Sequence, residues 1–188
     1  MLPTRWDLIS QFKGKRVLDI GGVGYKENEP RKSFFRKAWS RALRTTLDIN
    51  PSADIVADLN KPDSFPKIKQ KFDVISLFAV LEHIKYPAEI LELLPPTKEY
   101  WIILPSSSYI LCQQAEVYYQ QVIPGFKHII GWNMPQAVNF LTDCGYSIVE
   151  KGYIHDYQTW KGRLYSIAAG IIPIWLAREM YFKCVRGK

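Results

Sequence analysis

Three aspartates in the first third of the chain each follow or close an apolar run. Asp19 is followed directly by the glycine cluster of residues 21–24, and Asp48 and Asp58 close two further runs. Glycines after a strand allow turns that a Cβ would block, and they let a ligand approach the main chain. A carboxylate such as Asp48 can accept hydrogen bonds from both hydroxyls of a ribose, and Asp58 can accept from an exocyclic amine. Each acid alone also fits an ordinary turn, but their joint order favours a ligand site.

The segments that must position these acids alternate between two patterns. Apolar runs typical of strands cover residues 16–22, 44–50, 53–59, 72–80 and 100–105, and residues 31–44 and 81–94 have helical spacing. Such alternation predicts βαβ units and a mainly parallel sheet, whose ligand crevice lies beyond the carboxyl ends of the strands. Later in the chain we expect a helix over 134–145 that ends at Gly145, then two alternating segments, 146–154 and 179–186.

The order of these motifs resembles a known family. RVLDIGGVG, TTLDINPSADIVADLNKP, FDVISLFAVLEHI and YWIILP are similar to the motifs of class I S-adenosylmethionine-dependent methyltransferases, in the branch with VLEH after the fourth strand. The resemblance covers residues 14–106 and continues more loosely through GYSIVEKG and EMYFKCVRG. It implies a Rossmann-like α/β fold with strand order 3-2-1-4-5-7-6 and an antiparallel seventh strand. The 188 residues suit a single domain over 1–188.

The same resemblance implies S-adenosylmethionine as cofactor. The implied binding residues lie at the carboxyl ends of the first four strands: Asp19, Gly21, Gly22, Gly24, Asp48, Asp58, Leu59 and Phe78. Among them, Asp48 would hold the ribose hydroxyls, and Asp58 would contact the adenine amine with Leu59 beside the ring. Asp19, Gly21 and Phe78 would lie near the methionine part of the cofactor.

The glycine loop departs from the family pattern D-x-G-x-G-x-G. Val23 and Tyr25 occupy the second and third glycine positions, with Gly24 between them. We therefore expect a displaced or wider loop, in which Tyr25 covers the cofactor or substrate as a lid. A non-catalytic binding protein with this fold stays open as an alternative. A nicotinamide-dependent dehydrogenase fits less well, because the third glycine of G-x-G-x-x-G falls at Glu27.

Methyl transfer needs little chemistry from side chains. The sulfonium methyl group is already an activated electrophile, so the protein has mainly to align it with the acceptor. His83 is the candidate general base where the acceptor must lose a proton, and its plainer interpretation is that it helps to open the following helix. We expect no metal, because a zinc site would need the scattered cysteines and His83, His128 or His155 to converge. Three unpaired cysteines indicate a cytoplasmic protein with reduced thiols.

Two further segments bear on partners. Residues 31–44 contain six basic and no acidic residues, in a chain of net charge +7. An amphipathic surface helix is the favoured interpretation, and a nucleic-acid methyltransferase is the alternative. Residues 163–177 include the run from Ile167 to Ala177, which has no polar side chain. A buried lid or a homodimer contact is favoured there, and the alternative is a peripheral membrane contact or a wall for a lipid-like acceptor. The expected acceptor is a small or lipid-like molecule.

Overall fold

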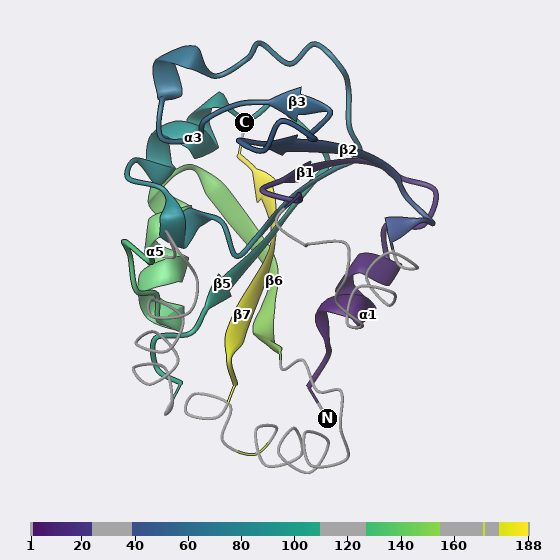
Figure 1. The fold of residues 1–188 in the computed structure, drawn as a ribbon. Coiled ribbons are helices and arrows are strands. Elements are labelled where there is room, and N and C mark those ends of the chain that lie inside the picture. Colours follow the sequence, from purple (N-terminus) through teal and green to yellow (C-terminus); the bar gives the residue numbers. More distant parts are fainter. Residues whose placement is uncertain (1, 24–38, 110–126, 155–170, 172–176, 188) are drawn as a thin grey trace.

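All described strands belong to one sheet. The computed structural model describes residues 2–23, 39–109, 127–154, 171 and 177–187, and its strands form a seven-stranded sheet of order β3-β2-β1-β4-β5-β7-β6 (Figure 1). The strands are β1 Arg16–Ile20, β2 Leu43–Asp48, β3 Ile55–Val56, β4 Val74–Phe78, β5 Glu99–Pro105, β6 Tyr146–Ile154 and β7 Glu179–Arg186. Strand β7 is antiparallel to β5 and β6, and the other pairs are parallel. The predicted strand order and antiparallel seventh strand are confirmed.

Short helices flank this sheet. They are α1 Arg5–Ser10, the 3-10 turns η1 Pro62–Ser64 and η2 Leu81–His83, then α3 Pro87–Leu93 and α5 Met134–Asp143. Two begin with a reciprocal capping box, in which Thr4 pairs with Asp7 and Asn133 pairs with Gln136. Helix α5 is followed by Gly145, whose φ of 82° suits a glycine after a helix end.

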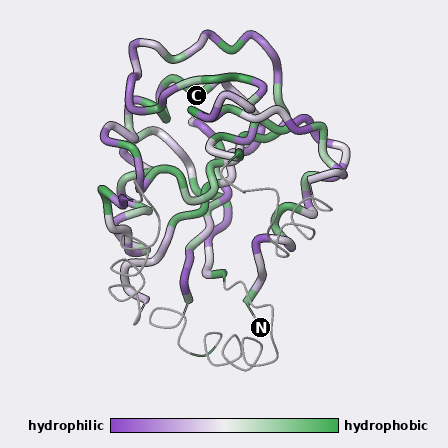
Figure 2. Tube along the Cα trace, in the orientation of Figure 1, coloured by the Kyte–Doolittle hydropathy of each residue, from purple (hydrophilic) through white to green (hydrophobic). Residues whose placement is uncertain are grey.

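Alternation along the central strands sends side chains to two cores. Val17, Val74 and Trp101 face the core that contains α1, whereas their neighbours in sequence face the core that contains α3 and α5. In Figure 1, α1 lies on one side of the sheet, and α3 and α5 lie on the other. Figure 2 shows hydrophobic residues along the central strands, as expected for strands that are covered on both faces.

Two predicted helices are corrected by the structure. The segment 81–94 is not one helix: η2 ends at His83, Ile84 is extended, and α3 starts only at Pro87. Proline is well tolerated in a first turn but restricts the residue before it, so the helix starts there. The helix expected over 31–44 does not reach its predicted end, because Leu43 begins β2 and is exposed. Residues 31–38 lie outside the described ranges.

The described ranges contain no helix with the length and hydropathy that a bilayer crossing requires. Of the apolar run in residues 163–177, only Ile171 and Ala177 are described. Ile171 is exposed and Ala177 is buried. The interpretations of that run as a lid, a dimer contact or a membrane contact therefore stay predictions.

Candidate functional site

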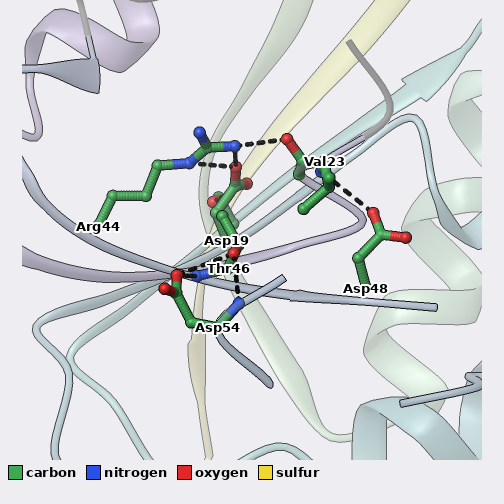
Figure 3. A network of polar contacts seen from close by, with 8 residues as sticks. Asp19, Val23, Arg44, Thr46, Asp48 and Asp54 are labelled. Atoms are coloured by element: carbon green, nitrogen blue, oxygen red, sulfur yellow. Dashed lines mark hydrogen bonds and ion pairs between the residues drawn. The ribbon is translucent and has the colours of Figure 1, made fainter. Parts of the chain in front are cut away.

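The carboxylate of Asp19, one residue before the end of β1, is held by an arginine from β2. Asp19 is 3% exposed. Its Oδ2 accepts a hydrogen bond from Arg44 Nε at 2.8 Å and a second one from Arg44 Nη2, and its Oδ1 accepts from Ser76 Oγ at 2.7 Å. The same guanidinium donates to the Gly22 carbonyl at 2.6 Å. Figure 3 shows the guanidinium lying against the Asp19 carboxylate and reaching the loop after β1. The ion pair thus fastens the glycine loop to the sheet.

Burial dominates the electrostatics of Asp19. Removal of the carboxylate from water raises its pKa above the ordinary value, although the charge of Arg44 and the Ser76 hydrogen bond pull it down. Trp39 lies over the other side of the arginine, with Arg44 Cζ 4.6 Å from the ring centroid. This stacking is a cation–π contact that further orients the guanidinium.

The first two glycines of the loop are required by close packing. Gly21 has a φ of 72°, and its N–H donates to the Leu47 carbonyl at 2.7 Å. A Cβ at Gly21 would overlap the Val80 side chain. A Cβ at Gly22 would overlap the Asp19 carboxylate and the Arg44 guanidinium. The sequence prediction of a glycine-dependent turn here is therefore explained by sterics.

Asp48 ends β2 in a more open environment. Its Oδ2 accepts from Val23 N at 3.1 Å and its Oδ1 from Asn50 N at 2.9 Å. The side chain is half-buried, and a carboxylate has lone pairs beyond these two bonds, so it can still accept from a ligand. The loop that follows is closed by Asp54, which accepts from Thr46 N at 2.7 Å and from Thr46 Oγ1 at 2.8 Å. These hydrogen bonds lower the Asp54 pKa.

A cavity of about 330 Å³ opens beside Asp48. Its lining comes from the carboxyl ends of β1 to β4 and the turns after them: Gly21, Asp48, Ile49, Ala57, Asp58, Leu59, Asn60, Ala79, Val80, His83 and Ile84. The volume is at the lower end of the range of about 300–1,000 Å³ typical for small-molecule sites. The structure therefore brings four predicted binding residues, Gly21, Asp48, Asp58 and Leu59, together with His83.

The other predicted residues surround a much smaller space. Asp19, Gly21, Gly22 and Phe78 line a cavity of about 10 Å³, which has room for about one water molecule. Phe78 packs against Phe12 and Trp39, each with a centroid separation of 6.3 Å. Arg5 from α1 also lines this space, and its Nε donates to Glu179 at 2.8 Å. Gly21 borders both cavities and so separates a wide half of the site from a narrow one.

His83 meets a second histidine at the rim of the wide cavity. His83 Nδ1 lies 2.7 Å from the Lys127 carbonyl oxygen. The His83 and His128 rings have centroids 4.7 Å apart. Each Nε2 atom lies 4.0 Å from Oε1 of Glu82, whose side chain is fully buried. His83 and His128 thus converge as a zinc site would require, but neither described cysteine, Cys144 or Cys184, belongs to this cluster.

Sequence reasoning missed Arg44, Glu82 and His128 as site residues. The signal for Arg44 lies in the strand register. Strands β1 and β2 pair from Arg16 and Leu43 onward, so Arg44 pairs with Val17. Arg44 therefore points to the same face as Val17 and as Asp19, two residues further along β1. No local spacing connects His128 to Glu82 and His83, which come from a distant part of the chain. Other predictions lie outside the described residues: Gly24, the proposed Tyr25 lid, the basic residues 31–38 and most of 163–177.

Comparison with known proteins finds similarity in structure but not in sequence. No protein-family model matches the chain, and no curated protein matches its sequence. A methyltransferase from Mesorhizobium loti, described as S-adenosylmethionine dependent, has a TM-score of 0.62 at 14% identity, over 97% of each chain. The complex of the Haloferax volcanii Trm112 methyltransferase activator with its methyltransferase gives 0.61 at 14% identity, over 98% of this chain and 89% of that one.

A third similar structure contains a bound product. It is the magnesium protoporphyrin IX methyltransferase of Synechocystis PCC 6803 with bound S-adenosylhomocysteine, at a TM-score of 0.57 and 15% identity, over 97% of this chain and 82% of that one. At identities this low, the structural similarities establish the fold alone. Together with the strand order, they show that the chain has the fold of class I S-adenosylmethionine-dependent methyltransferases.

Proposed function

We propose that this protein binds S-adenosylmethionine and transfers its methyl group to an acceptor. One observation carries the proposal: the wide cavity lies at the carboxyl ends of β1 to β4 and is lined by Asp48, Asp58 and Leu59. These are the side chains whose chemistry suits a ribose, an exocyclic amine and a flat ring. In an open parallel sheet, the crevice at the carboxyl edge is also the usual ligand site.

The roles of the residues follow from their surroundings. When bound, the cofactor supplies an electrophilic methyl group, so the chain has to bind, orient and exclude water. Asp48 would accept from the ribose hydroxyls with the lone pairs that Val23 and Asn50 leave open. Asp58 accepts from Asn60 N at 2.9 Å, which orients its carboxylate at the cavity rim. Leu59 packs against the core and would support the ring.

His83 remains the proposed general base. The Lys127 carbonyl can only accept a hydrogen bond, so His83 Nδ1 must carry the proton and donate. In the neutral ring Nε2 then has the lone pair, and it can take a proton from an acceptor. The ring lines the cavity, which supports this role where the acceptor is protonated.

For the acceptor we propose a small or lipid-like molecule. The support is the apolar run from Ile167 to Ala177 and the exposure of Ile171 at 77%. Sedimentation with anionic liposomes at low salt tests a membrane or lipid role, and Ile171→Glu with Trp175→Glu should abolish it. The similar structures include a small-RNA methyltransferase, so RNA is the acceptor class to test next.

A specific observation favours the alternative of a non-catalytic binding protein. The space that the methionine part would need is narrow among the described residues: the cavity of about 10 Å³ there is lined by Asp19, Trp39 and Phe78, and Asp19 is already ion-paired with Arg44. A protein that binds only adenosine-like ligands would need no more room than the wide cavity offers. The two functions therefore differ in what they require of the narrow half.

Calorimetry with three ligands separates them. Methyl transfer predicts that S-adenosylmethionine and S-adenosylhomocysteine bind in the micromolar range and more tightly than 5′-methylthioadenosine, which lacks the amino-acid part. Asp48→Ala should weaken S-adenosylhomocysteine by about 1–3 kcal/mol, the cost of lost hydrogen bonds in a buried site. Asp63→Ala, which removes an exposed carboxylate outside the cavity, is the matched control.

Each outcome has one meaning. Equal affinity for S-adenosylhomocysteine and 5′-methylthioadenosine, with Asp48 dependence, would support the non-catalytic alternative. The absence of binding by any of the three ligands would reject both. Binding that Asp48→Ala leaves unchanged would remove Asp48 from the site.

A further inference from the structure

Glu82, His83 and His128 form a cluster, and the proposed methyl transfer gives a role to His83 alone. Each offers one ligand atom, a carboxylate oxygen or an imidazole nitrogen, and the three atoms lie within 4.8 Å of one another. Glu82 is fully buried, and the side chains of His83 and His128 are 38% and 18% exposed. A buried carboxylate beneath two partly exposed imidazoles is a donor set of two nitrogens and one oxygen.

The hydrogen bond of His83 prepares its ring for coordination. Because Nδ1 donates to the Lys127 carbonyl, the neutral ring has its lone pair on Nε2, the atom that faces Glu82. Metal-bound histidines almost always donate their other ring nitrogen to a carbonyl or carboxylate, which fixes the tautomer and the ring orientation. The Lys127 carbonyl provides that support here.

The two segments that carry the cluster are also joined through the backbone. Ile129 N donates to the Glu82 carbonyl at 2.7 Å, one residue after His128. On the other segment, His83 N donates to the Val80 carbonyl at 3.0 Å within η2. The side-chain bond from His83 to Lys127 and the backbone bond from Ile129 to Glu82 therefore join the segments in both directions. Ligand atoms from distant parts of the chain are held together before any ion binds.

We propose that Glu82, His83 and His128 bind one divalent transition-metal ion. Bonds of about 2.0–2.2 Å place ligand atoms about 3.0–3.5 Å apart, so the 4.0 Å separations need only a small side-chain closure. Two imidazoles and a carboxylate suit zinc and the other first-row divalent ions, whereas Mg²⁺ prefers oxygen donors. Three protein ligands leave at least one coordination position for water or another ligand. A metal ion on Nε2 of His83 would occupy the lone pair that a general base needs, so the two proposed roles of His83 exclude each other in one molecule.

The competing explanation is an internal charge contact without metal. A protonated imidazole beside Glu82 would give the same side-chain arrangement. The 4.0 Å separations are longer than a hydrogen bond, which has a nitrogen–oxygen distance of about 2.7–3.2 Å. Oε1 of Glu82 lies at the same 4.0 Å distance from both imidazole nitrogens, an arrangement that suits one shared ion.

Titration of the tag-free, chelator-treated protein with Co²⁺ tests the proposal directly. We expect uptake of one ion per chain, with visible d–d absorption and no intense near-ultraviolet band of cobalt–thiolate ligation. Zn²⁺ should displace Co²⁺, and Mg²⁺ should not. His128→Ala and Glu82→Gln should each weaken Co²⁺ binding by at least about tenfold. Glu89→Gln, an exposed carboxylate on α3, should leave it unchanged.

The outcomes are distinct from those for the cofactor, because the titration contains no S-adenosyl ligand and Asp48→Ala should keep full metal uptake. No stoichiometric Co²⁺ or Zn²⁺ uptake by the unmodified protein would overturn the proposal. Uptake that is insensitive to both His128→Ala and Glu82→Gln would also overturn it. If the buried Glu82→Gln does not fold, His128→Asn carries the test, together with the rise in melting temperature that Zn²⁺ should cause and a chelator should reverse.

Discussion

Two aspartates lie at the carboxyl ends of neighbouring parallel strands, Asp19 one residue before the end of β1 and Asp48 at the end of β2, yet their environments differ. Asp19 is almost fully buried and is bound by Arg44 and Ser76. Asp48 is half-buried, and within the described ranges it accepts hydrogen bonds from two backbone N–H groups. Figure 3 shows both at the carboxyl edge of the sheet, with Arg44 beside Asp19 and Val23 beside Asp48.

The comparison shows that an acid at a strand end can serve either the fold, as Asp19 does, or a cavity, as Asp48 does. Asp19 already accepts three side-chain hydrogen bonds within the fold, and the space beside it has room for about one water molecule. Asp48 retains lone pairs and borders a cavity of about 330 Å³. Under the proposed function, a nucleoside would occupy the Asp48 half, whereas a charged group that contacts the Asp19 carboxylate would have to replace its bonds to Arg44.

The largest effect is expected where the two halves meet. Gly21→Ala should lower the free energy of unfolding by about 3 kcal/mol, since it combines the cost of a left-handed residue with overpacking against Val80. Gly14→Ala is the matched control, because Gly14 has a nearly identical φ of 73° and no atom near the built Cβ. It should cost only about 1 kcal/mol. Chemical denaturation that gives equal losses would mean that Gly21 does not join the two halves by close packing.

The second-largest loss of unfolding free energy is expected when the cation beside Asp19 is removed. Arg44→Met leaves the Asp19 carboxylate buried without its ion-pair partner, and we expect a loss of about 2–4 kcal/mol at neutral pH, toward the lower part of the range for buried pairs because Arg44 is 24% exposed. Without Arg44, burial would raise the pKa of Asp19 still further.

The loss of unfolding free energy caused by Arg44→Met should also depend on pH. Protonated Asp19 does not need the cation, so the cost of Arg44→Met should shrink as the pH falls through the raised pKa of Asp19. Denaturation curves at several pH values measure it, and Asp19→Asn in the same background should remove the dependence. A cost that is independent of pH would contradict the assignment of Asp19 as the buried charged partner.

The hydroxyl beneath Asp19 should have a smaller effect. Ser76→Ala removes a buried hydrogen bond of 2.7 Å to the carboxylate, which should cost about 1.5–3 kcal/mol. Because Ser76 also lowers the Asp19 pKa, nuclear magnetic resonance titration of the Asp19 carboxyl should give a higher midpoint in the variant. An unchanged midpoint would show that the hydroxyl does not stabilise the ionised form.

The smallest effect belongs to the open half. Lys61 lies 3.4 Å from Asp58, but its side chain is 72% exposed. Lys61→Ala should therefore change the free energy of unfolding by less than about 0.5 kcal/mol. The contrast with Arg44→Met is a direct comparison of an exposed and a buried pair at one sheet edge. Similar losses for both variants would reject the division into an open and a closed half.

Much of the fold could be predicted because the relevant signals are local. Strands β6 and β7 fall on the predicted residues 146–154 and 179–186, and the glycine after α5 has the expected left-handed φ. The strand order followed from the family resemblance rather than from periodicity. The failures also have local causes: Pro87 starts a helix that apolar spacing alone extends back to residue 81, and Leu43 continues a helical pattern although it begins β2.

The site could be predicted only where strand ends define it. Asp48, Asp58 and Leu59 converge because parallel strands share a carboxyl edge. His128 could not be assigned, since its approach to Glu82 depends on how a connection far along the chain returns to η2. The sequence motif predicted that Asp19 lies near the cofactor, but the motif alone does not include Arg44, which the strand register brings to the same face.

The Arg44–Asp19 ion pair has a consequence for the time course of binding. A ligand that must displace Arg44 from the Asp19 carboxylate would bind only the fraction of molecules in which that ion pair is open, and its apparent dissociation constant would rise in inverse proportion to that fraction. If the ion pair opens more slowly than ligand and protein meet, the observed association rate would level off at high ligand concentration, because opening of the ion pair and not diffusion then limits the rate. A nucleoside that occupies only the Asp48 half would show a rate that stays linear in its concentration.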